Sequence, residues 1–166
     1  MNKLYTLAAA AVLLTAGALG YRAMAAPTPA PEAQYVLLDG SKIDTQALKG
    51  RVTLVNFWAT SCVTCVAEMP RIVETHDKYR GRGYETLAVA MQYDPPSYVV
   101  NFVETRKLPF RVAIDNTGAV ARAWGDIQLT PTTFVVNKRG EIVKRYVGEP
   151  DFAELHRLIE KLLAEA

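Results

Sequence analysis

The chain contains two cysteines, and both lie in one short stretch, FWATSCVTCVAEMP, over residues 57–70. Two residues separate Cys62 from Cys65, a spacing that brings both sulfurs to one side in the first turn of a helix. Such a pair can form a redox-active dithiol, half of a metal site, or a short structural disulfide. The residues around the pair and elsewhere in the chain discriminate between these three kinds of chemistry.

The position of the two cysteines favours redox chemistry. A strand-like run, RVTLVNFWA over 51–59, precedes them, so Cys62 is predicted near the start of a helix. Unpaired backbone N–H groups and the positive end of the helix stabilise a thiolate there. Cys65 lies one turn deeper, where it is better shielded and suited to resolving a mixed disulfide. An attacking thiolate and a nearby resolving thiol are the two requirements of thiol–disulfide exchange.

A metal site is the alternative from another functional class. A structural zinc ion usually takes four ligands, whereas His76 lies three helical turns beyond Cys65 and His156 lies on the last helix. Two thiolates could still hold Cu(I), so a copper-handling protein stays open. An inert disulfide is the least favoured, because a bridge that closes only a few residues stabilises a chain of this length little. For the redox function we expect neither a metal ion nor a cofactor.

The segments that must position the dithiol alternate in type along the chain. Strands are predicted over 35–40, 51–59, 84–91 and 109–115, and as an antiparallel hairpin over 130–137 and 141–148. Helices are predicted over 62–79, 94–107, 117–125 and 151–166. Asp94 is expected to cap the second of these helices, and Asp151 with Glu154 to form a capping box at the last. Buried strands that alternate with helices predict an α/β fold, a central mixed sheet flanked by helices.

The N-terminal segment has the composition of an export signal. Residues 4–21 carry no charge and lie between Lys3 and Arg22. Small residues follow at Ala23 and Ala25, which fits cleavage before Ala26. The same apolar stretch is nearly long enough to cross a bilayer core of about 30 Å as an uncleaved anchor. We predict a signal peptide or N-terminal membrane anchor over 1–25, a Pro/Ala linker over 26–34 and one domain over 35–166.

Either form of the leader places the domain in the periplasm or on the outer face of the cytoplasmic membrane. The formal charge of +2 comes from Lys3 and Arg22, so the rest of the chain is formally neutral. A neutral domain gives no electrostatic reason to expect binding to nucleic acid or to an anionic membrane surface. Membrane attachment is therefore expected only through residues 4–21.

Two motifs together carry a family resemblance. NFWATSCVTCVAEMP, followed far downstream by LTPTTFVVN, resembles the thioredoxin-like TlpA/ResA family of exported thiol–disulfide oxidoreductases. The resemblance covers roughly residue 35 to the C-terminus. It implies a thioredoxin-like fold, with the strand and helix before 109–115 as the βα insertion of that group. It also implies that Cys62 is the nucleophile and Cys65 the resolving thiol.

The resemblance assigns further residues to the site. Pro131 matches the cis-proline that faces the dithiol, which turns the backbone of Thr130 to bind an incoming peptide like an added strand. Glu68 falls where the group carries an acid, one turn beyond Cys65, and could accept the proton of that thiol if it is partly buried. A solvated carboxylate on the helix surface is the alternative for Glu68. Trp58 is expected to pack beneath the active-site turn.

Three positions depart from the family pattern. Asn56 stands where thioredoxin itself has a buried aspartate, which makes Glu68 the better candidate for proton transfer. Ser61 replaces the tryptophan usual before the first cysteine. Val63 and Thr64 supply neither the proline of strong reductants nor the histidine of strong oxidants. The sequence therefore leaves the redox potential open.

These residues and the resemblance predict an exported oxidoreductase that reduces protein disulfides. A membrane thiol-reducing electron donor would restore the dithiol, and cytochrome c maturation or oxidase copper-site assembly would supply the clients. A periplasmic disulfide oxidase or isomerase is the nearest alternative. A Cu(I)-handling protein is the alternative from a different class.

Overall fold

The computed structural model describes residues 28–165. The signal peptide or anchor predicted over 1–25 lies outside this range. Among the described residues, no helix combines the length and the apolar character needed to span a bilayer.

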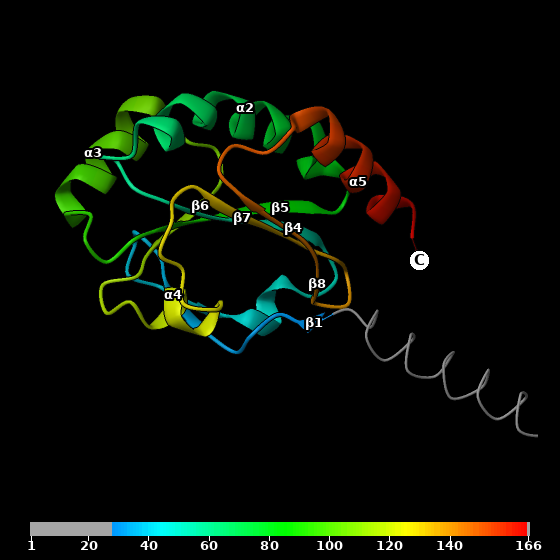
Figure 1. The fold of residues 1–166 in the computed structure, drawn as a ribbon, viewed down its shortest axis with the longest axis horizontal. Coiled ribbons are helices and arrows are strands. Elements are labelled where there is room, and N and C mark those ends of the chain that lie inside the picture. Colours follow the sequence, from blue (N-terminus) through cyan, green and yellow to red (C-terminus); the bar gives the residue numbers. More distant parts are fainter. Residues whose placement is uncertain (1–27, 166) are drawn as a thin grey trace, which may run out of the picture.

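A central sheet of six strands forms the middle layer of the molecule (Figure 1). Its strands, in spatial order, are β1 (Thr28–Pro29), β8 (Glu141–Val147), β7 (Thr132–Val136), β4 (Val52–Trp58), β5 (Tyr84–Ala90) and β6 (Arg111–Ile114). β4, β5 and β6 run parallel, whereas β7 and β8 join as an antiparallel hairpin. Every residue of β4 is buried, as its β-branched and aromatic residues indicate for a strand covered on both faces. The predicted mixed α/β sheet is confirmed.

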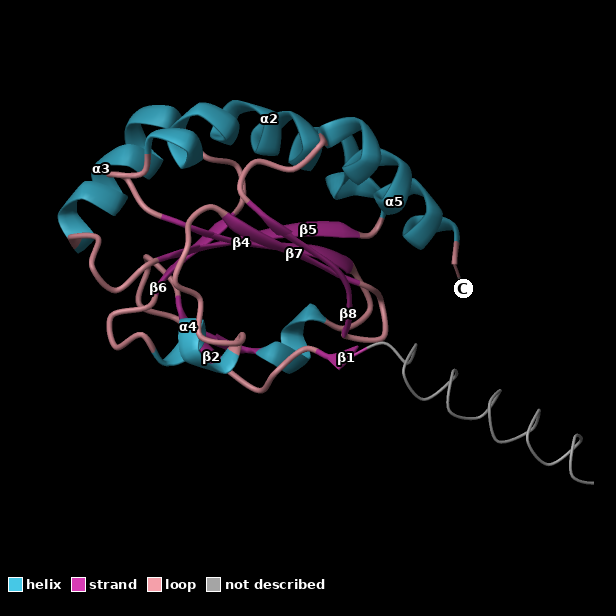
Figure 2. Cartoon of the chain, in the orientation of Figure 1, coloured by secondary structure: helices cyan, strands magenta, loops and turns pink. Residues whose placement is uncertain are grey.

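Helices cover both faces of this sheet (Figure 2). One face carries α2 (Val63–Tyr79), α3 (Pro96–Arg106) and α5 (Phe152–Ala164), and a 3₁₀ turn, η2 (Arg80–Arg82), follows α2. The other face carries α4 (Ala119–Ala123), the 3₁₀ helix η1 (Thr45–Leu48) and a hairpin of β2 (Gln34–Val36) and β3 (Lys42–Asp44). The buried apolar residues accordingly divide into two clusters, one around Met69 and Ile72 and one around Phe57 and Trp124.

Residues 28–34 pack against the domain, which the sequence did not predict. β1 pairs in antiparallel register with the outer side of β8, and Ala30 donates its N–H to the carbonyl oxygen of Gly140 over 2.8 Å. The hydroxyl of Thr45 donates to the carbonyl oxygen of Pro31 over 2.6 Å. The alternating prolines do give an extended chain, but the free edge of β8 offers backbone groups with which such a chain can pair. The described part of the linker predicted over 26–34 thus packs against the domain.

A second strand was also missed in the sequence analysis. No strand was predicted over residues 42–44, yet the segment KID forms β3 and pairs with β2. Ile43 lies opposite Tyr35 in this hairpin and packs against the cluster around Phe57 and Trp124. A short strand with one inward apolar residue has too little periodicity to be recognised from sequence.

A buried hydrogen bond fastens this hairpin to the helix on the same face. The indole Nε1–H of Trp124 donates to the hydroxyl of Tyr35 over 2.9 Å. The Trp124 ring lies against Phe57 and Phe134, with centroids 5.9 and 4.9 Å away. Tyr35 is fully buried, and burial raises the pKa of its hydroxyl to about 12. The hydroxyl thus stays uncharged at neutral pH and serves the indole as an acceptor.

We expect Tyr35→Phe to lower the free energy of unfolding by about 1–3 kcal/mol, because the buried indole N–H of Trp124 then loses its partner. Denaturant unfolding of the oxidised protein, followed by tryptophan fluorescence, measures the change. Tyr98→Phe, at a tyrosine that is 64% exposed, is the matched control and should change stability by less than about 0.5 kcal/mol. Equal stabilities for the two variants would contradict the importance of this hydrogen bond.

Candidate active site

Cys62 and Cys65 form a disulfide where β4 meets α2. The chain leaves β4 at Trp58, and the N–H of Cys62 donates to the carbonyl oxygen of Ala59 over 3.1 Å to close the intervening turn. Cys62 then acts as the N-cap of α2, and its sulfur accepts the N–H of Cys65 over 3.2 Å. Its position at the helix start is the one predicted from sequence.

The two sulfur-bearing residues differ in accessibility. Cys65 is fully buried, within the same apolar cluster as Trp58 and Met69. Cys62 lies at the border of this cluster and is partly exposed. An incoming disulfide can therefore reach Cys62. Cys65 is closed to solvent, and its sulfur contacts that of Cys62.

The loop before β7 faces the disulfide. The carbonyl oxygen of Thr130 lies 3.6 Å from the sulfur of Cys62. The peptide bond between Thr130 and Pro131 is cis, as the resemblance implied. The carbonyl of Pro131 accepts the N–H of Gly148 over 2.8 Å, which holds the loop against the segment after β8. The fold thus brings together two motifs that are far apart in the sequence.

Glu68 is fully buried beneath the disulfide helix, one turn beyond Cys65. Its Oε1 accepts one hydrogen of the Asn56 amide over 3.1 Å, and the Oγ1 of Thr133 accepts from the same amide nitrogen over 2.9 Å. Among the described residues its Oε2 has no hydrogen-bond partner. The solvated alternative for this carboxyl is therefore excluded.

The protonation of Glu68 follows from this burial. Loss of solvent raises its pKa to about 7, the hydrogen bond from Asn56 opposes that rise, and the carboxylate of Glu149 adds to it. A carboxyl with a pKa near neutrality can both accept and release a proton under physiological conditions.

Trp58 is fully buried at the end of β4. Its ring packs on that of Phe102 of α3, with centroids 5.1 Å apart, and it belongs to the same cluster as Cys65. The indole thus packs between the end of β4 and α3, within the cluster that contains Cys65.

Asp94 does not cap α3 as the sequence suggested. The helix begins at Pro96 without a side-chain cap, and the Asp94 carboxylate turns toward the active-site turn instead. It accepts the backbone N–H of Thr60 over 2.6 Å and the hydroxyl of Thr60 over 2.5 Å. The Asp-Pro pair is a common helix start, and no local signal reveals a partner 34 residues away.

The adjacent Tyr93 contacts the other side of the site, which the sequence analysis also missed. Its hydroxyl shares a hydrogen bond of 3.2 Å with the hydroxyl of Thr130. The Tyr93 side chain is 55% exposed, and the sequence neighbours of Thr130 and Cys62, Leu129 (64%) and Val63 (83%), are large apolar residues that are exposed too. Exposed apolar residues gathered next to a reactive group are typical of a surface that binds another protein.

The two histidines serve the packing of the helices. His76 contacts the hydroxyl of Thr86 at 3.2 Å, and His156 contacts that of Thr75 at 2.9 Å. Within residues 28–165, no three Cys, His, Asp or Glu side chains converge in a way that could hold a metal ion.

The chain matches the Redoxin family model over residues 25–159. It is 35% identical to thiol-disulfide oxidoreductase ResA of Bacillus thuringiensis subsp. konkukian, over 80% of this chain and 76% of that protein. ResA of Halalkalibacterium halodurans is 34% identical over 78% of this chain and 72% of its own length.

Solved structures give the same relationship. A thioredoxin-family thiol:disulfide interchange protein from Chlorobium tepidum superimposes with a TM-score of 0.75, at 30% identity, over 84% of this chain and 98% of its own. A partly exposed sulfur at a helix start, a buried second sulfur and a facing cis-proline loop form the set that exchanges a dithiol for a disulfide. The chain belongs to the Redoxin family and is a thiol–disulfide oxidoreductase of the thioredoxin-like TlpA/ResA group.

Proposed function

We propose that this oxidoreductase reduces protein disulfides outside the cytoplasm, with Cys62 as the nucleophile and Cys65 as the resolving thiol. The observation that carries the assignment is the difference in burial: Cys62 is partly exposed at the helix start, whereas Cys65 is fully buried. The N–H of Cys65, which points at the Cys62 sulfur, favours the thiolate at that sulfur in the reduced protein.

The proposed cycle transfers two electrons to the substrate. The Cys62 thiolate attacks one sulfur of a substrate disulfide, forms a mixed disulfide and releases the other substrate sulfur as a thiolate, which takes up a proton. Cys65 loses its proton and attacks the Cys62 sulfur, which forms the Cys62–Cys65 bridge and releases the second substrate sulfur. A membrane thiol-reducing donor then returns the bridge to the dithiol.

We assign the proton of Cys65 to Glu68. The carboxyl lies one helical turn from Cys65, both residues are fully buried, and the pKa of Glu68 is about 7. No charged partner pairs with this carboxyl in the described part of the chain, since its hydrogen-bond donor is the neutral amide of Asn56. Glu68 is thus suited to hold the proton while Cys65 attacks.

Thr130 and Pro131 form the proposed binding wall for the substrate chain. The carbonyl of Thr130 lies at the Cys62 sulfur and Thr130 is partly exposed, so its backbone can pair with an extended segment next to the substrate disulfide. Pro131 is buried behind it and supports the wall.

The location outside the cytoplasm and the direction of electron flow rest on the apolar segment over 4–21 and on the TlpA/ResA relationship. A signal peptide or anchor over 1–25 fits a site of action in the periplasm or at the outer face of the membrane. A potential close to that of strong oxidants, about −120 mV, would contradict the reductase direction. Cytochrome c maturation and oxidase copper-site assembly are the candidate destinations of the electrons.

The roles of the two cysteines predict opposite behaviour of their variants. We expect Cys62→Ser to abolish reduction of a disulfide substrate, because no exposed thiolate remains to attack. Cys65→Ala should attack normally and accumulate mixed disulfides that it cannot resolve. Non-reducing electrophoresis of cells that express each variant measures this, and the captured proteins identify donor and clients.

The double variant Cys62→Ser/Cys65→Ala is the control and should capture nothing. Capture through Cys65 in the Cys62→Ser variant, with disulfide reduction retained, would reverse the two assignments.

We expect Glu68→Gln to slow the resolution of a mixed disulfide by about a hundredfold near pH 7, because the amide cannot take up the proton of Cys65. Alkylation of Cys62 in the reduced protein should keep its rate. In the unchanged protein resolution should accelerate as the pH rises through about 7 and Glu68 ionises, and Glu68→Gln should flatten this rise. Stopped-flow kinetics with a preformed mixed disulfide measure the step.

The stability of the oxidised protein gives a second readout of Glu68. Its pKa rises from the ordinary 4.5 to about 7 on folding, so the folded state binds the proton more tightly than the unfolded state. The protein should therefore lose stability as the pH rises from about 4.5 to about 7, and Glu68→Gln should remove that loss. Glu149→Gln is the control, since it removes one cause of the raised pKa and should move the loss to lower pH. Identical pH dependence in all three proteins would contradict the assignment.

A further inference from the structure

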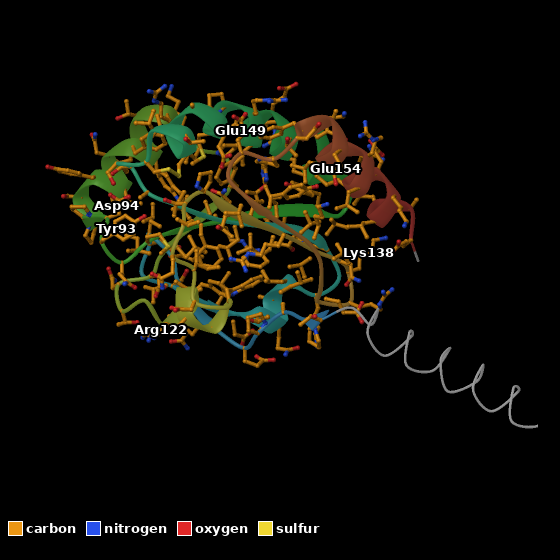
Figure 3. The ribbon with its side chains drawn as sticks, viewed as in Figure 1. Tyr93, Asp94, Arg122, Lys138, Glu149 and Glu154 are labelled. Atoms are coloured by element: carbon orange, nitrogen blue, oxygen red, sulfur yellow. A yellow bond between two sulfur atoms is a disulfide. The ribbon has the colours of Figure 1, made fainter. Side chains whose placement is uncertain are left out.

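We propose that Tyr93 and Asp94, two adjacent residues of the loop after β5, fix the relative position of the two sides of the dithiol site. Asp94 positions Cys62 through Thr60, and Tyr93 positions Thr130. The inference rests on the proposed roles of Cys62 and Thr130. Figure 3 labels both residues, which lie next to one another at the end of the molecule that carries α3.

The Asp94 carboxylate is buried and hydrogen-bonded, although it lies in a loop. It is 3% exposed, and two hydrogen bonds from Thr60, one from the backbone and one from the hydroxyl, meet its two oxygens. A buried carboxylate is costly unless such donors replace its lost water. Because α3 takes no cap from it, the observed partner of this carboxylate is the active-site turn.

The bond to Thr60 acts close to the reactive sulfur. Thr60 lies within the turn that the N–H of Cys62 closes on the carbonyl of Ala59. The loop that carries Asp94 is itself anchored, since the N–H of Asp94 donates to the carbonyl of Met91 over 2.9 Å and the N–H of Met91 donates to that of Trp58 over 3.0 Å. Asp94 therefore ties the turn before Cys62 to a fixed point on the sheet.

Tyr93 ties the facing wall to the same loop. Its hydroxyl contacts the Thr130 side chain at 3.2 Å, and the carbonyl of Thr130 lies 3.6 Å from the Cys62 sulfur. The loop thus touches both the attacking residue's turn and the proposed substrate wall. A displacement of reacting groups by about 1 Å can lower a rate about a hundredfold, so a shared anchor for the two sides matters to the reaction.

Asp115 provides a matched control for Asp94. It is 2% exposed, follows the neighbouring strand β6, and accepts the N–H groups of Val120 and Ala121 over 3.2 and 2.8 Å. Both aspartates are thus buried and doubly hydrogen-bonded, but none of the contacts of Asp115 involves the dithiol site.

The experiment compares Asp94→Ala with Asp115→Ala in the full chain. Thermal unfolding should show a loss of stability in both variants. Only Asp94→Ala should slow alkylation of Cys62 in the reduced protein and lower kcat for disulfide reduction, by about tenfold or more. Asp94→Asn should restore most of the rate, because its amide oxygen can accept the Thr60 N–H and its amide nitrogen can donate to the Thr60 hydroxyl oxygen.

Thr60→Val removes one of the two hydrogen bonds and keeps the backbone one. Thr60→Val should lower the rate of Cys62 alkylation and kcat by less than Asp94→Ala does. It provides the test if Asp94→Ala fails to fold. Tyr93→Phe should raise KM for a disulfide-bonded peptide severalfold and leave kcat and Cys62 alkylation unchanged. Tyr98→Phe, at another exposed tyrosine, should change none of these quantities.

Two outcomes would overturn the proposal: alkylation rates within twofold of the unchanged protein in folded Asp94→Ala and Thr60→Val, or an equal loss of rate in Asp115→Ala. An unchanged KM in Tyr93→Phe would overturn the part that concerns Thr130. Failure of the proposed function is separate, since it would show as retained activity in Cys62→Ser. Alkylation of Cys62 reads the position of the sulfur whatever the direction of electron flow.

Discussion

The N–H of Cys65 points at the sulfur of Cys62, and the chemistry of the site depends on this contact at the start of α2. It exists because β4, buried on both faces at the centre of the sheet, delivers the chain to the helix at one defined place. The free N–H groups of a helix start favour a negative sulfur, and the spacing of two residues keeps the second sulfur within reach. The same geometry buries Cys65 and leaves Cys62 accessible, and this difference is the basis of the two roles that we propose for them.

Three loops meet around this helix start, and each contributes a different function. The turn after β4 carries Cys62, the loop before β7 supplies the carbonyl of Thr130, and the loop after β5 contacts both. β5 pairs with β4 along the sheet, and α3 packs on Trp58 through Phe102. The loop that joins β5 to α3 therefore lies beside the active-site turn and contacts it.

The buried polar residues beneath the disulfide are arranged for reactivity at a cost in stability. Glu68 is removed from solvent and hydrogen-bonded to a neutral amide, with its second oxygen lacking a partner among the described residues. A carboxyl so placed resists ionisation, which is why its pKa lies near neutrality. Asn56 stands in place of the aspartate of thioredoxin, so the hydrogen-bond donor to Glu68 is neutral and no second charge is buried beside it. Glu68 is therefore the carboxyl to which we assign the proton of Cys65.

The sequence by itself determined the longer strands and helices and the cysteine pair, because these depend on neighbours along the chain. The run of β-branched and aromatic residues over 51–59 and the cysteine spacing predict a strand, a helix start and two sulfurs on one side of that helix, and the hairpin after Pro131 follows from its turn. Only the tertiary structure decided what each side chain meets. Asp94 was predicted to cap a helix and instead binds Thr60, and the burial of Glu68 decided between its two alternatives. Residues 28–34 were predicted as part of a linker, and β1 within them pairs with the edge of β8. Each of these outcomes depends on contacts between residues distant in sequence, which local pattern does not encode.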